Sequence, residues 1–182
     1  MVSDHGEEFL DHGLWGHGHS LYSEILHVPL ILKLPAGRGA GERRGDTAGH
    51  VDILPTLLAA AGVRIPAEAQ GRDLLSSSAG ADDTPVLSLL QLDGAGIASV
   101  IEEGRQLIQW RPDHPAGRLE MYDLRADPHE RRDLMGRDLL WAGFMSSRLR
   151  EIRRTHERSF AAPRVPLDGE LGKRLRALGY VH

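Results

Sequence analysis

The residues best suited to chemistry lie together near the start of the chain, between Ser3 and His19. This stretch holds four of the ten histidines and four carboxylates, interleaved with four glycines. Glycines let a backbone turn tightly, so the imidazole and carboxylate groups can converge. Carboxylate oxygens suit hard divalent cations, imidazole suits borderline ones, and oxyanion chemistry needs proton donors close to a metal. The stretch therefore predicts a metal-assisted site for an oxyanion.

A solvated loop is the plainer alternative for these residues. For any one histidine taken alone the two interpretations stand about even, because histidine is intermediate in burial and versatile in role. The succession of Asp4, His5 and Gly6 directly after an apolar start favours a site. Ligands commonly bind where a strand ends and the chain turns, at the carboxyl edge of an open α/β sheet.

The residues that follow predict the elements that would position this loop. Residues 28–34 are a nearly continuous apolar run, typical of a strand buried on both faces, with Pro29 at its start. Residues 20–26 predict one or two helical turns, with Ser20 in position to cap them and Glu24 within reach of a capping box. The loop is therefore expected between two sheet elements.

A series of motifs runs in order along nearly the whole chain. They are Ser-Asp-His-Gly-Glu at 3–7, His-Gly-Leu-Trp-Gly-His-Gly-His-Ser-Leu-Tyr at 12–22, Val-Pro-Leu-Ile at 28–31, Val-Asp-Ile-Leu-Pro-Thr-Leu-Leu at 51–58, Gly-Arg-Asp-Leu-Leu at 71–75, the Tyr-Asp-Leu region at 120–134 and Leu-Arg-Ala-Leu-Gly-Tyr at 175–180. Together they resemble the second half of the sulfatase family, in the alkaline-phosphatase-like superfamily. Asp133 stands where the family's Tyr-Asp-Leu signature usually has Asn. Ordered matches are far more specific than any single motif.

The resemblance implies a metal site at the start of the loop. In the family, the Asp of the first motif binds a divalent cation that also holds the sulfate oxygens, which makes Asp4 the strongest ligand candidate. The next position is Asn or His in family members. His5 could ligate the metal as a neutral imidazole or orient the nucleophile as a donor, and metal ligation is favoured. Ca²⁺ is the first expectation, with Mg²⁺ and Mn²⁺ as alternatives.

The resemblance also implies a group that contacts the sulfate. In family members a Lys or His a few residues before the Tyr of the second motif has this role. Gly18 lies where many members have Lys, flanked by His17 and His19. Either imidazole, when protonated, could act as general acid or bind the oxyanion. His19 is favoured because it directly precedes residues 20–22, although the register leaves His17 open.

Part of the family pattern is absent from this chain. Family members carry an N-terminal half with a Cys-x-Pro-x-Arg type signature, whose Cys or Ser becomes a formylglycine nucleophile, and an earlier pair of metal-binding acidic residues. This chain has no cysteine, and residues 159–164 have the wrong spacing for the Ser form. A central strand needs about five residues before such a motif, and only two precede Ser3. We therefore expect a C-terminal fragment, inactive alone, with the N-terminal half as a partner and a small-molecule or sugar sulfate ester as substrate.

Two alternatives to a sulfatase fragment remain. A phosphate or phosphonate ester hydrolase of the same superfamily shares the Asp-His-Gly motif, and a non-enzymatic module or decayed reading frame would explain the absent nucleophile. Other classes are disfavoured. A net charge of -4 gives no reason to expect nucleic acid or an anionic membrane as partner. No apolar run approaches the ~20 residues of a membrane span and no signal peptide is present, so the compartment stays unknown.

The fold class expected is α/β, in two domains. Residues 1–80 would form the C-terminal part of an alkaline-phosphatase-like α/β domain, and residues 84–182 a small α+β subdomain, joined by small polar residues near 76–84. The subdomain is predicted from short apolar runs at 85–92, 97–102, 105–110 and 118–124, which favour a four-stranded antiparallel sheet, and from one long helix at 137–157.

Further expectations concern residues outside the loop. A helix over residues 52–62, capped by Asp52, would turn Val51, Leu54 and Leu57 toward the core. Asp52 is therefore interpreted as a cap and not as a ligand. His12 is expected to contact the side chains of the site and not the ligand itself. His50 is expected to be a surface residue. Tail residues 171–178 predict a short amphipathic helix.

Overall fold

The computed structural model describes residues 1–76, 84–92, 95–111, 117–159, 169 and 173–174. A first compact unit covers Met1–Ile152 and a second covers Arg153–His182. Most of the predicted linker and most of the predicted tail helix lie outside the described residues. None of the helices in the described ranges is both long enough and apolar enough to cross a bilayer.

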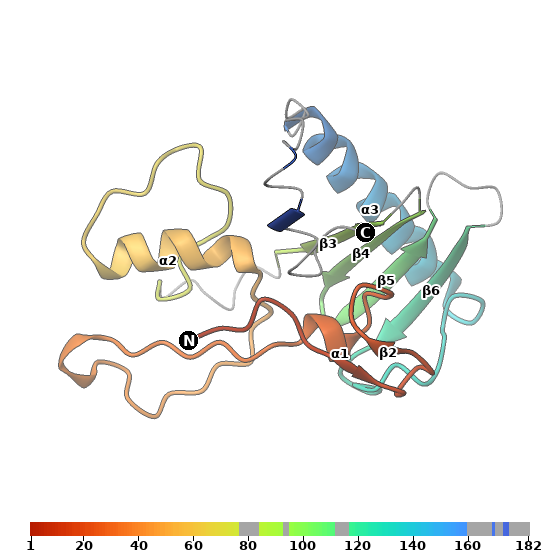
Figure 1. The fold of residues 1–182 in the computed structure, drawn as a ribbon, viewed down its shortest axis with the longest axis horizontal. Helices are drawn as coiled ribbons and strands as arrows, with labels where there is room; N and C mark the ends of the chain where they lie inside the picture. The colour runs from red at the N-terminus through yellow and green to blue at the C-terminus, as the bar shows by residue number, and fades with distance from the viewer. Residues whose placement is uncertain (77–83, 93–94, 112–116, 160–168, 170–172, 175–182) are drawn as a thin grey trace. The chain divides into compact units, whose positions relative to one another are not determined.

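A four-stranded antiparallel sheet, in the order β3-β4-β5-β6, forms the centre of the first unit (Figure 1). Its strands are β3 (Val86–Leu92), β4 (Ala95–Glu102), β5 (Arg105–Trp110) and β6 (Arg118–Asp123). These strands coincide with the four apolar runs, so the predicted sheet is confirmed. Glu103 and Gly104 join β4 to β5 with φ angles of 51° and 73°. Positive φ at both positions is the geometry of a two-residue hairpin turn.

Helix α3 (Leu139–Ser159) covers one face of this sheet (Figure 1). The long predicted helix is thereby confirmed, and only part of its apolar surface is buried. Leu140 and Phe144 are 88% and 46% exposed, whereas Met145 and Leu149 are buried. The core between helix and sheet consists of Ala98, Val100, Leu107, Met121, Ala142, Met145 and Leu149. Only the side of α3 that lies against the sheet is buried, although its sequence has apolar side chains on more than one side.

The other face of the sheet carries the segment that follows the His-rich loop. This segment contains helix α1 (Ser23–Leu26), which is part of the predicted helical turn. A second core lies there, made of Leu21, Tyr22, Ile97, Ile108 and Tyr122. Side chains alternate across a strand, so Leu107 faces α3 and Ile108 faces this segment. The loop is thus anchored on the antiparallel sheet, and the domain boundary near residue 80 stays a prediction.

Residues 28–34 do not form the predicted buried strand. They make a single antiparallel bridge, between Val2 and Leu30, supported by hydrogen bonds between Met1 and Ile31. Ile31 is 55% exposed. A strand buried on both faces needs neighbours on its two sides and layers above and below. The described part of the chain supplies only residues 1–2 as a neighbour.

Helix α2 (Ile53–Ala60) confirms the predicted helix but not its predicted buried face. The Asp52 carboxylate accepts hydrogen bonds from the backbone N–H groups of Gly49 (2.9 Å) and Arg72 (2.8 Å). It therefore joins two backbone segments and does not cap α2. Thr56 is buried beside it. The side of α2 that carries Asp52 and Thr56 is therefore the buried one. The side chains predicted to be buried are exposed: Val51, Leu54 and Leu57.

Candidate functional site

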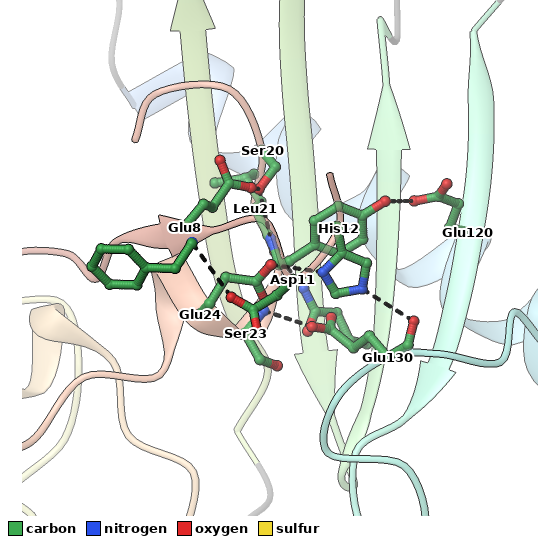
Figure 2. A network of polar contacts seen from close by, with 12 residues as sticks. Glu8, Asp11, His12, Ser20, Leu21, Ser23, Glu24, Glu120 and Glu130 are labelled. Carbon is green, nitrogen blue, oxygen red and sulfur yellow. Dashed lines mark hydrogen bonds and ion pairs between the residues drawn. The ribbon is translucent and has the colours of Figure 1, made fainter. Parts of the chain in front are cut away.

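The His-rich loop folds around a small hairpin. Its strands are β1 (Glu8–Phe9) and β2 (Trp15–Gly16), which pair antiparallel. Glu8 is fully buried and accepts a hydrogen bond of 2.6 Å from the Ser20 hydroxyl (Figure 2). The prediction that Ser20 caps a helix is therefore wrong, since Tyr22 is the N-cap residue of α1. A buried carboxylate needs a hydrogen-bond donor, and the Ser20 hydroxyl supplies one to Glu8. This bond closes the base of the loop.

Gly6 lies directly against α1. Its N–H donates to the carbonyl oxygen of Ile25 at 2.8 Å. A Cβ atom at this position would lie 1.9 Å from the carbonyl oxygen of Glu24. Only glycine fits this approach, and the packing of α1 therefore fixes the backbone next to His5.

Gly6→Ala is expected to lower the free energy of unfolding by about 2 to 3 kcal/mol, because the methyl group must displace either the loop or α1. Urea denaturation measures the loss, and amide chemical shifts of residues 4–19 report the displacement. Gly45→Ala is the matched control, since a Cβ atom there would meet nothing within 4 Å. The control is expected to change stability by less than about 0.5 kcal/mol. Equal stability of the two variants would contradict the close approach.

The two predicted metal ligands lie side by side. Asp4 Oδ2 is 3.9 Å from His5 Nε2. His5 Nδ1 lies 2.7 Å from the carbonyl oxygen of Gly6, which can only accept, so Nδ1 carries the proton. Nε2 then presents its lone pair. The Asp4 and His5 side chains are 85% and 41% exposed, so the pair is open to a ligand.

Local electrostatics keep Asp4 ionised. The backbone N–H groups of Asp4 and His5, and then the His5 imidazole, hold the pKa of the Asp4 carboxyl below its ordinary value. His50 adds a smaller contribution of the same sign. His50 Nε2 also lies 2.9 Å from the carbonyl oxygen of Ser3. His50 is exposed, as expected of a surface residue, and the fold brings its ring to the start of the loop.

Of the two predicted sulfate-contacting histidines, the structure brings His17 to this pair. The rings of His5 and His17 lie 4.3 Å apart at 34°. His17 Nδ1 is 3.1 Å from Glu7 Oε1, so the carboxylate accepts from Nδ1 and leaves Nε2 available. His19 is exposed, and its side chain makes no hydrogen bond or ring contact with another described residue. The catalytic role of either histidine stays a prediction.

The ligand set within the described ranges is small. No group of three or more His, Asp or Glu side chains converges there in a way that could hold a metal ion. Hard divalent cations take six or more ligands, of which several come from protein in a tight site. Metal ligation by Asp4 and His5 stays a prediction.

A partly buried polar network that the sequence did not reveal joins the loop to α1 and the segment after β6 (Figure 2). His12 Nδ1 is 2.6 Å from Glu24 Oε1, and His12 Nε2 is 3.2 Å from the carbonyl oxygen of Glu130. Glu130 Oε2 accepts the Ser23 N–H at 2.6 Å. The His12 ring stacks on Tyr22, with ring centroids 3.7 Å apart. The only sequence signal for Glu130 is its place in the 120–134 motif.

Tyr22 connects the network to the sheet. Its hydroxyl donates to Glu120 Oε2 at 2.9 Å, and the Trp110 indole N–H donates to the same oxygen at 2.8 Å. Burial, followed by the bond to Glu120, raises the pKa of Tyr22 far above its ordinary value. The hydroxyl therefore stays protonated and remains a donor. These bonds tie the loop segment to β5 and β6.

Comparison with known proteins finds similarity to sulfatases over parts of the chain. Residues 11–85 match the family model described as N-sulphoglucosamine sulphohydrolase, C-terminal. The N-acetylglucosamine-6-O-sulfatase of Bacteroides thetaiotaomicron is 26% identical over 167 residues, which cover 75% of this chain and 26% of that protein. The sulfatase YidJ of Escherichia coli is 37% identical over 76 residues, 41% of this chain and 15% of that protein.

A solved structure shares the fold. It is described as a complex with its substrate D-glucosamine-2-N,6-O-disulfate, and it matches with a TM-score of 0.66 at 24% identity. The match covers 87% of this chain and 34% of that one. The chain therefore shares the mixed α/β fold of this solved structure. The chain spans 15% to 34% of the length of these three proteins.

Proposed function

We propose, from the relationship of this chain to the C-terminal portion of the sulfatase family, that it supplies one side of a metal-dependent site for hydrolysis of sulfate esters. The observation that carries the proposal is the convergence of Asp4 Oδ2 and His5 Nε2 at 3.9 Å, with His17 against the His5 ring. These groups provide an anionic ligand, a neutral nitrogen ligand and a proton donor. That combination suits an oxyanion bound to a cation.

The residues fit a divalent cation. Two neighbouring ligand atoms, each about 2.4 Å from a Ca²⁺ ion, lie about 3.4 to 4 Å apart. Asp4 Oδ2 and His5 Nε2 have such a separation, and Gly6 holds His5 in the tautomer that a ligand requires. When bound, the cation would neutralise charge on the sulfate oxygens. Ca²⁺ is our first choice, with Mg²⁺ and Mn²⁺ as alternatives.

His17 is the proton donor in this proposal. Glu7 accepts from Nδ1, so Nε2–H of the imidazolium form is free to donate. As the ester bond to sulfur breaks, the Nε2 proton passes to the oxygen of the departing alcohol. His19 is the second candidate, since the sequence register favours it.

The remainder of the site would come from an N-terminal half, which in this family carries the formylglycine nucleophile. Exposed apolar side chains support such a partner. Leu54 and Leu57 on α2 are more than half exposed, as are Val51 before α2 and Ile31 in the extended segment. Clustered large apolar side chains at a surface are typical of an interface. This chain alone is therefore expected to be inactive.

The substrate class is proposed to be a sulfated sugar. One relative is named for an N-acetylglucosamine 6-O-sulfate, and the structural neighbour is described with a disulfated glucosamine as its substrate. Both proteins match over three quarters or more of this chain. The sugar itself would be bound by loops of the N-terminal half together with the loop described here.

Calorimetric titration with Ca²⁺, Mg²⁺, Mn²⁺ and Zn²⁺ tests the metal site. The wild-type chain is expected to bind weakly, with a Kd on the order of 1 mM or above, because it holds only part of the ligand set. Asp4→Ala is expected to abolish this binding. Asp11→Ala removes a carboxylate from the same loop and is expected to leave it unchanged. A tight site independent of Asp4, or turnover of an aryl sulfate by this chain alone, would refute the proposal.

A further inference from the structure

We propose that His12, Glu24 and Glu130 form a proton-dependent latch that holds the His-rich loop on the antiparallel sheet. The latch is closed while the His12 imidazole is doubly protonated and the Glu130 carboxyl is neutral. It opens when these two protons are lost. Its three members come from separate segments: the loop between β1 and β2, helix α1 and the stretch after β6 (Figure 2). The latch does not depend on the catalytic role proposed above.

The position of His12 requires a proton on each ring nitrogen. Nδ1 faces Glu24 Oε1 at 2.6 Å, and Nε2 faces the carbonyl oxygen of Glu130 at 3.2 Å. Carboxylate and carbonyl oxygens only accept hydrogen bonds. Both contacts are therefore satisfied when the imidazole is doubly protonated and positively charged. His12 is then the cation that pairs with Glu24.

Glu130 requires a proton for a different reason. Its side chain is 2% exposed, and Oε1 has no hydrogen-bond partner within the described residues. A buried carboxylate with an unsatisfied oxygen strongly favours its neutral form. With Glu130 neutral and His12 charged, the cluster including Glu24 carries no net charge. After loss of two protons, two carboxylates would face a neutral imidazole in a buried site.

The electrostatics agree with this geometry. Burial raises the pKa of Glu130 to about 7, and the charge of Glu24 acts in the same direction. Burial lowers the pKa of His12, but the hydrogen bond to Glu24 and the contacts with Glu130 outweigh it and raise the pKa above its ordinary value. The other titratable groups facing the cluster are Tyr22 and Tyr122, whose pKa values are raised, so they supply no charge near neutral pH.

The pH dependence follows from proton binding. Between pH 4.5 and about 7 the folded chain keeps a proton on Glu130 that the unfolded chain has lost. Stability therefore falls as pH rises through this range. His12 acts in the same sense, since its stabilising proton is lost only above its ordinary pKa of 6.5. The two groups titrate as a coupled pair, and the latch weakens on the alkaline side of neutrality.

Helix α1 transmits the state of the latch to the loop. Its first residue, Ser23, donates its N–H to Glu130, and its third, Ile25, accepts the N–H of Gly6 at 2.8 Å. Gly6 directly follows His5. Opening of the latch thus removes support from the backbone that positions His5.

Urea unfolding of the full chain between pH 5 and pH 8.5 tests the latch. Glu130→Gln cannot ionise but keeps an acceptor for Ser23. The unfolding equilibrium constant of the wild type is expected to rise over this range by about tenfold to a hundredfold more than that of the variant. Glu68→Gln, at an exposed glutamate, is the matched control and should follow the wild type. Parallel curves for wild type and Glu130→Gln would overturn the proposal.

Amide hydrogen exchange at Gly6 and Ser23 supplies the local readout. Protection factors of both amides are expected to fall as pH rises from 5 to 8.5 in the wild type and to fall much less in Glu130→Gln. If that variant fails to fold, His12→Gln replaces it in the unfolding experiment. His12→Gln should destabilise the chain at pH 6 and differ little from the wild type at pH 8.5. An equal loss at both pH values would also overturn the proposal.

Discussion

Replacement of His17 by glutamine is expected to lower the turnover number for a sulfate ester by about 10² to 10⁴ fold, the usual effect of removing a general acid. The expected loss follows from the position of His17. The His17 ring lies 4.3 Å from that of His5, and Glu7 holds its Nδ1 at 3.1 Å, which leaves Nε2 to donate. Glutamine keeps a hydrogen-bonding amide, but this amide is not acidic enough to transfer a proton to the leaving oxygen.

The measurement is kcat for an aryl sulfate by this chain joined to a sulfatase N-terminal half. His19→Gln is the matched control, two residues away and exposed, and it is expected to keep kcat within about threefold because it lacks a position beside His5. Circular dichroism of each variant confirms folding. Loss of activity in His19→Gln with retention in His17→Gln would instead support the register favoured by the sequence.

Leu107→Ala is expected to lower the free energy of unfolding by about 3 to 4 kcal/mol, because a fully buried leucine leaves a cavity in a close-packed core. Leu107 is 0% exposed on β5 and belongs to the core shared with Met145 and Leu149 of α3. Its neighbour Ile108 supports Leu21 and Tyr22 on the opposite face. A weakened sheet therefore also loosens the segment that carries α1.

Urea denaturation at a fixed pH measures this loss. Leu89→Ala on β3 is the matched control, since Leu89 is 57% exposed, and its expected effect is below about 0.5 kcal/mol. Amide exchange at Ser23 should accelerate in Leu107→Ala but not in the control. Equal destabilisation by the two substitutions would show that the sheet is not the core of the first unit.

The sequence pattern predicted correctly those elements whose formation depends mainly on their own residues. The four strands and the long helix match the runs and periodicities in the sequence, and Glu103 with Gly104 forms the turn between β4 and β5. Hydrophobic alternation and turn chemistry act over a few residues, so they can be recognised without knowing the fold. Prediction was wrong where a partner was needed. Residues 28–34 and the face of α2 formed by Leu54 and Leu57 are apolar, but the described chain offers nothing that covers them.

The candidate site shows the same division. The loop was recognisable from its density of imidazole and carboxylate groups, and Asp4 and His5 are adjacent in sequence and in space. The contacts that hold the loop were not recognisable. His12 meets Glu130 across 118 positions, and His50 meets Ser3 across 47. Such contacts leave no local signal, because each residue is polar and unremarkable among its neighbours.

By itself, the sequence determined the candidate site residues, where the antiparallel sheet runs, and the resemblance to sulfatases through ordered motifs. Only the tertiary structure decided that His17 and not His19 stands beside His5, that Ser20 closes the loop on Glu8, and that His12 lies between Glu24 and Glu130. Chemical type and short-range periodicity are properties of neighbours along the chain. Tautomer, protonation and orientation are set by acceptors and burial that only the folded chain brings together.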